Sequence, residues 1–281
     1  MMKVRMGVMT PFLVAAAGFV LSPVLSMQAQ QAGENSGPPK YIYLSNVVLK
    51  PGSSADYVKL QSEENAALRA EKINAHHFGM WSVTGNENRV LYFYGADSFA
   101  DLQKMHDSVM GNAAVRAVLD KNEAAEGQLV QSDNGSIYEY EKDLSLNSGP
   151  SLEQDRFMDI TLFHLRQGQG PAFRHLVKVY LKAYESVSGA KFVFFQKMYG
   201  QGSGDTYILV TPLKSLGDVD SNIANDKKFV EAAGPDLLTL MRAQGPTIIE
   251  STESNLFAFG PKLSYVPDSW MTNSPDFWGQ K

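Results

Sequence analysis

Cysteine is absent from this chain of 281 residues. Its absence excludes thiolate nucleophiles, cysteine-ligated metals, disulfide bonds and anchors attached through a lipid-modified cysteine. Clusters of basic residues are also missing, and 25 Lys and Arg against 30 Asp and Glu give a formal net charge of −5. Because a nucleic-acid-binding surface carries a basic patch or stripe, we expect no nucleic-acid partner.

Histidine is scarce, and its five positions are scattered, with no pair two or four residues apart. His76 and His77 begin an expected strand, where neighbouring side chains point to opposite faces. The Gly-rich stretch 200–204 lies between two expected strands, whereas a phosphate-binding loop leads from a strand into a helix. No Ser-His-Asp order or Gly-x-Ser-x-Gly motif occurs. We therefore predict no metal site and no bound cofactor.

The N-terminus contains an apolar run of ten residues, 12–21, after Lys3 and Arg5. This run is shorter than the roughly 20 residues that span a membrane. Small and turn-forming residues then lead to Ala29. The pattern predicts a signal peptide over residues 1–29, with a periplasmic or secreted product that has no membrane span after cleavage. The alternative is an uncleaved membrane anchor. Residues 30–40 form a flexible lead-in rich in Gly, Pro, Gln and Asn.

The chain repeats itself. Residues 41–60 (YIYLSNVVLKPGSSADYVKL) and residues 157–176 (FMDITLFHLRQGQGPAFRHL) share one plan, 116 positions apart. Each has an alternating strand-like stretch, a turn containing Gly and the start of an amphipathic helix. Ser-x-x-Asp helix starts recur at Ser98 and Ser215, and a Leu-Ser pair recurs at 144–145 and 263–264. These matches indicate a tandem duplication; the alternative is two unrelated domains with a similar order of elements.

Each repeat has the order βαββαβ, which is the ferredoxin-like plan. We predict a first repeat at 41–146, a linker at 147–156, a second repeat at 157–265 and an aromatic tail at 266–281. A sheet covered by helices on one side leaves its other face bare, and an apolar bare face needs a partner. Two sheets in one chain can cover each other.

On this order of elements, and on the strand, Gly turn and helix that open both repeats, the chain resembles the dimeric α+β barrel superfamily. That group includes antibiotic-biosynthesis-monooxygenase-like and NIPSNAP-like proteins. The resemblance implies an α+β fold in which two tandem ferredoxin-like βαββαβ repeats form one pseudo-symmetric barrel. Helices would lie outside and a cavity between the sheets. It leaves the oligomeric state open.

Some members of this superfamily handle haem or oxidise aromatic compounds without a bound metal, using Asn, Trp, His or Arg in the cavity. The matching residue types here are Asn46, His77, Trp81 and Arg89. They do not align with a family motif, so the resemblance assigns them no role.

Alternation places Tyr43 and Ser45 on one face of the first strand, and Asp159 and Thr161 are their counterparts in the second repeat. We expect this mixed face to line the cavity, because the purely apolar face should meet the helices. The alternative is that the aromatic residues are inter-sheet core. Asp159 lies inside an apolar strand, so it is either a base in the cavity or a carboxylate that faces water at a sheet margin. The predicted cavity residues are Tyr43, Ser45, Asn46, His77, Trp81, Arg89, Tyr92, Tyr138, Asp159 and Thr161.

Three functions are open on these observations. The first is an exported barrel with a structural role or with a small hydrophobic or aromatic ligand, which the lack of a catalytic motif favours. The second is a cofactor-free monooxygenase-like or haem-handling enzyme that uses the inter-sheet cavity. The third is a protein-interaction module that acts through its outer surface and its aromatic tail.

Overall fold

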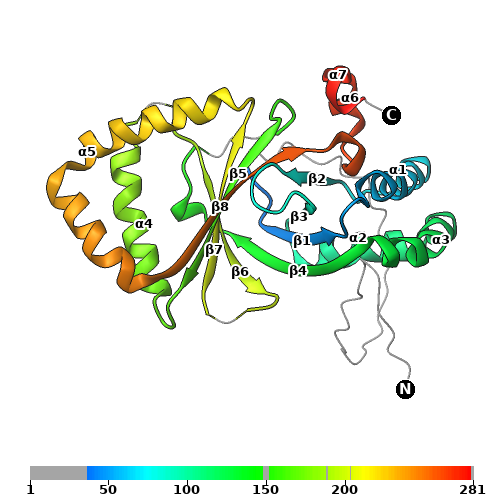
Figure 1. Ribbon diagram of the computed structural model, residues 1–281, viewed down its shortest axis with the longest axis horizontal. Helices are drawn as coiled ribbons and strands as arrows, with labels where there is room; N and C mark the ends of the chain where they lie inside the picture. Colours follow the sequence, from blue (N-terminus) through cyan, green and yellow to red (C-terminus); the bar gives the residue numbers. More distant parts are fainter. Residues whose placement is uncertain (1–36, 148–151, 188, 203, 280–281) are drawn as a thin grey trace, which may run out of the picture.

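The computed structural model describes residues 37–147, 152–187, 189–202 and 204–279 (Figure 1). The predicted signal peptide, residues 1–29, lies outside the described residues, as does most of the lead-in. The first half of the fold consists of β1 (Tyr41–Leu49), α1 (Ser54–Ala70), β2 (His77–Ser82), β3 (Arg89–Ala96), α2 (Phe99–Gly111), α3 (Ala113–Leu129), β4 (Val130–Tyr140) and the 3₁₀ turn η1 (Lys142–Leu144).

The second half repeats this order and ends in a short helical tail. It consists of β5 (Phe157–Leu165), α4 (Gly170–Tyr184), β6 (Val193–Tyr199), β7 (Thr206–Leu213), α5 (Gly217–Ile248), β8 (Ile249–Phe259), the 3₁₀ turn η2 (Pro261–Leu263), α6 (Asp268–Asn273) and α7 (Pro275–Trp278). One long helix, α5, therefore stands where the first half has α2 and α3. It is broken at Gly234, whose φ of 71° is not helical and which Pro235 follows.

The strands of the described residues form one closed barrel in the order β1-β3-β2-β8-β5-β7-β6-β4. Each half contributes a sheet with its first strand between its last and its third. Within a half the pairing is long, as in the eight residue pairs from Tyr41↔Ala96 to Val48↔Arg89. The two seams that join the halves are shorter, with three pairs between β2 and β8 and four between β4 and β6. This is the predicted tandem ferredoxin-like barrel.

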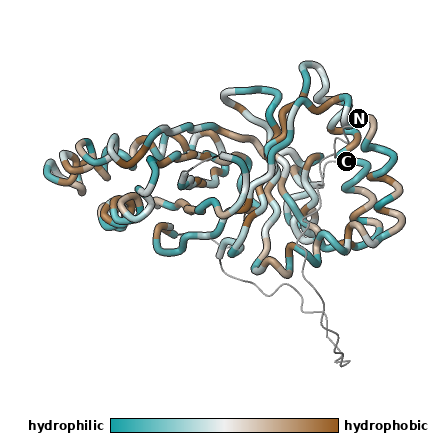
Figure 2. Tube along the Cα trace, turned by 90° about the horizontal axis from the view of Figure 1, so that it is seen from below, coloured by the Kyte–Doolittle hydropathy of each residue, from teal (hydrophilic) through white to brown (hydrophobic). Residues whose placement is uncertain are grey.

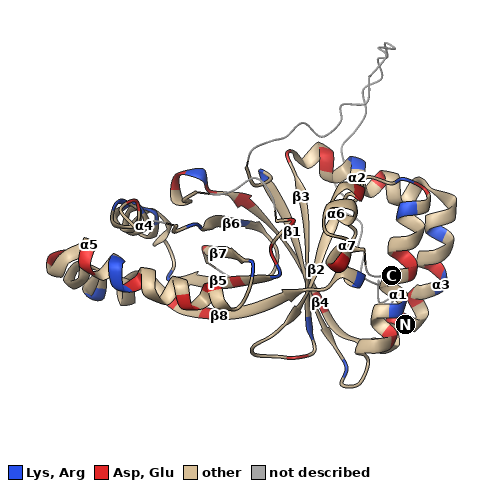
Figure 3. Ribbon diagram, turned by 90° about the horizontal axis from the view of Figure 1, so that it is seen from above, with Lys and Arg blue, Asp and Glu red and all other residues tan. Residues whose placement is uncertain are grey.

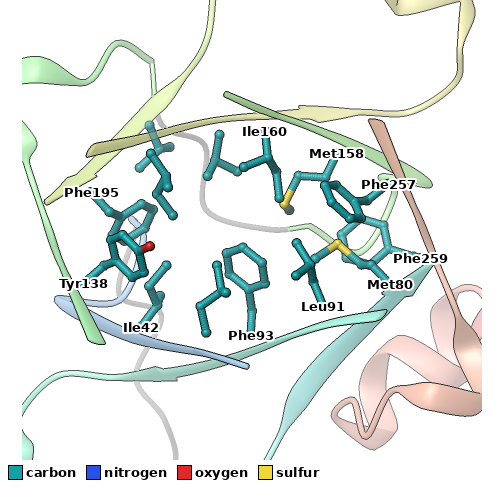
Figure 4. Close-up of a cluster of buried hydrophobic side chains, with 14 of the residues drawn as sticks. Ile42, Met80, Leu91, Phe93, Tyr138, Met158, Ile160, Phe195, Phe257 and Phe259 are labelled. Atoms are coloured by element: carbon teal, nitrogen blue, oxygen red, sulfur yellow. The ribbon is translucent and has the colours of Figure 1, made fainter. Parts of the chain in front are cut away.

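Apolar side chains from every strand meet inside the barrel (Figure 4). Ile42 and Leu44 of β1 point inward there, and Tyr43 and Ser45 point outward to the helices. The prediction that the mixed face lines the space between the sheets is therefore wrong. The physical reason is that both sheets enclose the barrel interior, where apolar side chains of all the strands meet, so the more apolar face of β1 turns to it. The outward face meets amphipathic helices, whose polar side chains can form hydrogen bonds with hydroxyl and carboxyl groups of the strands.

The helices lie on two opposite sides of the barrel, with α1, α2 and α3 on one side and α4 and α5 on the other (Figure 1). Charged residues gather on helices and loops and are sparse along the strands (Figure 3). Hydrophobic and hydrophilic residues alternate along the helices, as expected for helices that bury one face (Figure 2). Within the described residues, no helix is long and apolar enough to cross a membrane.

The repeated Leu-Ser pairs have the same role in both halves. Leu144 and Leu263 end the two 3₁₀ turns and are fully buried. Ser145 Oγ accepts a hydrogen bond from the Phe194 backbone N–H at 2.9 Å, and Ser264 Oγ accepts one from the Gly79 N–H at 2.9 Å. Each pair thus fastens the end of its own half to the second strand of the other half: η1 to β6 and η2 to β2.

The aromatic tail packs across one end of the barrel. Trp270 stacks on Phe78 of β2 at a centroid distance of 5.4 Å, and Trp278 lies edge-on to Phe259 of β8 at 5.7 Å. Trp278 Nε1 donates a hydrogen bond to the Glu153 carbonyl at 2.8 Å. Arg69 of α1 forms an ion pair with Asp268 of α6. The tail therefore covers apolar surface at this end.

Candidate functional site

The ten predicted cavity residues do not form one site. Five lie between the first half of the barrel and its helices: Tyr43, Ser45, His77, Trp81 and Tyr92. Three point into the barrel: Asn46, Arg89 and Tyr138. The remaining two, Asp159 and Thr161, lie on the outer face of the second half. Because inward and outward residues alternate along each strand, residues adjacent in the sequence reach different sites.

The outer face of the first half is filled by its own side chains. Tyr57 of α1 is fully buried beside Tyr92, and Tyr43 packs against Tyr94 at a centroid distance of 5.9 Å. Burial lowers the pKa of His77 to about 4, so this histidine is neutral at physiological pH. Its ring packs on Tyr94 at 4.8 Å. His77 is therefore a packed core residue.

Two glutamates that the sequence analysis did not single out lie in this packed layer. Burial raises the pKa of Glu64 on α1 to about 7 and the pKa of Glu126 on α3 to about 8. Gln61 Nε2 donates to both carboxyl groups, at 3.1 Å and 3.3 Å. They are helix residues with ordinary polar neighbours, so only the packing of α1 on α3 reveals their burial.

The corresponding layer of the second half is hollow. A cavity of about 320 Å³ lies between the outer face of β5, β6 and β7 and the helices α4 and α5. We call it the helix–sheet pocket. Asp159 and Thr211 are neighbours on its floor, paired across β5 and β7. Its aromatic lining consists of Phe163, Phe173, Tyr180, Tyr184, Phe192 and Phe194.

Comparison of the two halves explains why this pocket exists. Tyr43 and Tyr94 face each other across β1 and β3, at the third and sixth positions of their strands. Asp159 and Thr211 occupy the same positions of β5 and β7. Two large rings in the first half are thus replaced by two small polar side chains in the second. The loss of both rings leaves space above the sheet.

Asp159 is the polar centre of this pocket. Its carboxyl group has no hydrogen-bond or ion-pair partner among the described residues, and desolvation raises its pKa. A second carboxylate, Asp226 of α5, accepts a hydrogen bond from the Tyr184 hydroxyl at 3.0 Å. The Tyr184 ring in turn stacks on Phe229 at 4.3 Å. The pocket can therefore hold an apolar ring and place it beside the Asp159 carboxyl group, which has no hydrogen-bond partner among the described residues.

Haem is a poor fit to this pocket. A haem iron needs an axial ligand, most often His, Cys, Met or Tyr. The described lining contains no histidine, and one of its two tyrosine hydroxyls is already bonded to Asp226. Within the described residues, no group of three or more His, Asp or Glu side chains is arranged to hold a metal ion.

A second cavity, of about 270 Å³, lies inside one end of the barrel, at the C-terminal ends of β1 and β5. We call it the barrel-end chamber. Three of the predicted residues line it: Asn46 and Arg89 form polar walls, and Tyr138 lies toward the core. Burial raises the pKa of Tyr138 to about 12. The opposite end has an apolar cavity of about 220 Å³ beside Trp270. Thr161 lines none of the three; its hydroxyl lies 2.8 Å from that of Ser254.

No family model matches the sequence, and no curated protein matches it. Solved structures do match. An anthrone oxidase-like protein aligns over 80% of this chain and 93% of its own, with 12% identity and a TM-score of 0.53. A NIPSNAP-like domain protein from Burkholderia xenovorans aligns over 35% of this chain and 83% of its own, with 15% identity and a TM-score of 0.29.

A chlorite dismutase from Candidatus Nitrospira defluvii, in complex with imidazole, aligns over 85% of this chain and 95% of its own, with 11% identity and a TM-score of 0.46. The chain has the dimeric α+β barrel fold. At these identities the likeness concerns the fold of this α+β barrel protein and assigns none of its residues a role.

Most of the helix–sheet pocket was not predicted from the sequence. Asp159 was a predicted cavity residue, and Thr211, Phe192, Tyr180 and Tyr184 were not. A usable signal was present in the aligned repeats: Tyr43 against Asp159 and Tyr94 against Thr211 are exchanges of a large ring for a small polar group. Two such exchanges on one face of adjacent strands indicate lost volume.

Proposed function

We propose that this protein binds a small aromatic or apolar molecule in the helix–sheet pocket. One observation carries the proposal: where the first half packs Tyr43 and Tyr94, the second half has Asp159 and Thr211 below a cavity of about 320 Å³. Concave, largely apolar cavities of roughly 300 Å³ or more with a few polar groups are typical of small-molecule sites.

The chemistry of the walls indicates what the ligand looks like. Ring-lined walls favour a flat apolar ligand, because offset and edge-on ring contacts add to the burial of apolar area. Asp159 has no partner among the described residues and pays a desolvation cost. A ligand N–H or O–H that donates to this carboxyl group would offset part of that cost. We therefore expect a ring system with one donor group.

Binding of N-phenyl-1-naphthylamine tests this proposal, since it is neutral, aromatic, carries one N–H and becomes fluorescent in apolar sites. We expect saturable binding by the wild-type protein and a loss of affinity of about tenfold or more in Asp159→Tyr, which restores the ring that the first half has at this position. The matched control is Thr161→Tyr, on the same face of β5 but outside the pocket, which should bind like wild type. Equal binding by both variants would exclude this pocket.

A second candidate function is cofactor-free oxidation of an aromatic compound in the same pocket. The supporting observation is Asp159: an unpaired carboxyl group with a raised pKa in apolar surroundings is suited to accept a proton. The similar fold of an anthrone oxidase-like protein suggests anthrone as a trial substrate. Anthrone and dioxygen would yield anthraquinone, which takes up one oxygen atom, and water, which contains the other.

Absorbance of anthraquinone measures this reaction against the protein-free background. We expect the isosteric Asp159→Asn variant to lose about 100-fold or more in rate, as is typical when a general base is removed. It should still bind N-phenyl-1-naphthylamine within a few-fold. A wild-type rate no higher than background leaves binding as the function of the pocket.

The site of action is a further part of this proposal. We place the protein in the periplasm or outside the cell, because residues 1–29 carry the pattern of a signal peptide. N-terminal sequencing of the protein from its host checks the predicted cleavage near Ala29.

A further inference from the structure

The barrel-end chamber is a second, separate cavity, and both halves build it. Its lining includes Asn46 and Arg89 from the first half and His164, Lys197 and Thr206 from the second. The middle of the barrel is apolar, so the chamber has apolar walls toward the core, formed by residues such as Leu91 and Phe257. The helix–sheet pocket lies on the other side of the sheet, so the two cavities share no lining residue.

Three buried polar atoms in this chamber have no hydrogen-bond partner among the described residues. They are Asn46 Oδ1, Arg89 Nε and Thr206 Oγ1. Thr206 is only 1% exposed. Buried polar atoms in native proteins are nearly always satisfied, so a group of orphans around one cavity indicates a partner that enters it. The orphans comprise an acceptor, a donor and a hydroxyl that can be either.

The charges around the chamber favour an anion. Glu253 is engaged by Arg89 Nη1 at 3.1 Å and by Asn255 Nδ2 at 2.7 Å. Lys197 has no carboxylate partner among the described residues; its ammonium donates to the Gln201 carbonyl at 3.0 Å. Arg89 and Glu253 neutralise each other, so the positive charge of Lys197 remains in the chamber. The chain as a whole has a formal net charge of −5.

We propose that the barrel-end chamber binds a small hydroxycarboxylate with an apolar body. The carboxylate is complementary to the Lys197 ammonium and the Arg89 N–H, and such charge-assisted hydrogen bonds are the strong ones. The hydroxyl supplies the donor that Asn46 Oδ1 lacks. The apolar body lies against Leu91 and the neighbouring core side chains. This inference is independent of the proposed function of the helix–sheet pocket.

Three related compounds separate the parts of this inference: 4-hydroxybenzoate, its neutral amide 4-hydroxybenzamide, and benzoate, which lacks the hydroxyl. Isothermal titration calorimetry of the full chain measures each affinity. We expect 4-hydroxybenzoate to bind best, the amide about tenfold or more weaker and benzoate about fivefold weaker, in line with the loss of one charged and one neutral hydrogen bond. Equal affinity for the acid and the amide, or no binding at millimolar concentration, would overturn the proposal.

Variants locate the binding. Lys197→Met should weaken 4-hydroxybenzoate about tenfold and leave the amide unchanged, and Thr206→Val should weaken the acid about fivefold. Lys178→Met removes the same charge from the outer surface of α4, where the lysine pairs with Asp143 at 3.4 Å, and should have no effect. Asp159→Tyr should also leave 4-hydroxybenzoate binding unchanged, so failure of either site is separable from failure of the other. Unchanged binding by Lys197→Met would refute the assignment. Thermal unfolding followed by circular dichroism confirms that each variant is folded.

Discussion

At the scale of single residues, Glu64 and Glu126 are two carboxyl groups that the packing of the first half removes from water. They share the Gln61 amide between α1 and α3, and burial is the first cause of their raised pKa values, about 7 and about 8. The Glu64 charge is the next cause for Glu126. Since two close, buried carboxylates repel each other, both are expected to hold their protons at mildly acidic pH.

The stability of the protein should therefore fall as the pH rises from about 4.5 to about 8. The unfolded chain releases both protons near pH 4.5, whereas the folded chain releases them only near pH 7 and pH 8, so in between a rising pH favours the unfolded state. We expect Glu126→Gln to raise the free energy of unfolding by about 1–3 kcal/mol at pH 8 and by much less at pH 5. Chemical unfolding at both pH values measures it. Glu231→Gln, at an exposed position of α5, is the control. An equal effect at both pH values would contradict this account.

At the scale of elements, the tail helices α6 and α7 stand out because they are short and yet contribute to the core. Trp278 is 3% exposed and belongs to the cluster that fills the barrel, and Trp270 is only partly buried against it. The two helices are only six and four residues long, too short to be stable alone, so their position depends on these side chains. The tail is thus held by its tryptophans.

We expect Trp278→Ala to lower the free energy of unfolding by about 3–5 kcal/mol, the range for a buried Trp. Trp270→Ala is the matched comparison, and its effect should be clearly smaller because its ring is partly exposed. Denaturant unfolding monitored by far-UV circular dichroism gives both values. If the two variants lost the same amount, burial of Trp278 would not be what holds the tail.

The order of elements was predictable from the sequence. Which face of each strand turns into the barrel was not. Alternation, Gly turns and Ser-x-x-Asp starts are local signals; Ser98 Oγ does accept from the Asp101 N–H, at 3.0 Å. In β1, however, both faces carry apolar residues, so nothing local distinguishes the inside from the outside. The helix–sheet pocket and the chamber depend on contacts across 40 or more positions of sequence, as between Tyr184 and Asp226, and local patterns do not contain them.

At the scale of the whole molecule, the barrel is two similar sheets closed by two short seams. The seams carry three and four residue pairs, while β1 and β3 share eight. The apolar interior makes up for the short seams, because every strand places side chains into it. Neither sheet could leave that inner face in water, so each half depends on the other.

The presence of both sheets on one chain has a consequence for how their outer layers can change. In a pair of identical subunits, any exchange that empties one outer layer empties the other as well. Tethered halves are free to specialise: the first keeps Tyr43 and Tyr94 packed under its helices, and the second has lost that packing at Asp159 and Thr211. One half can then carry the stability that the other has lost.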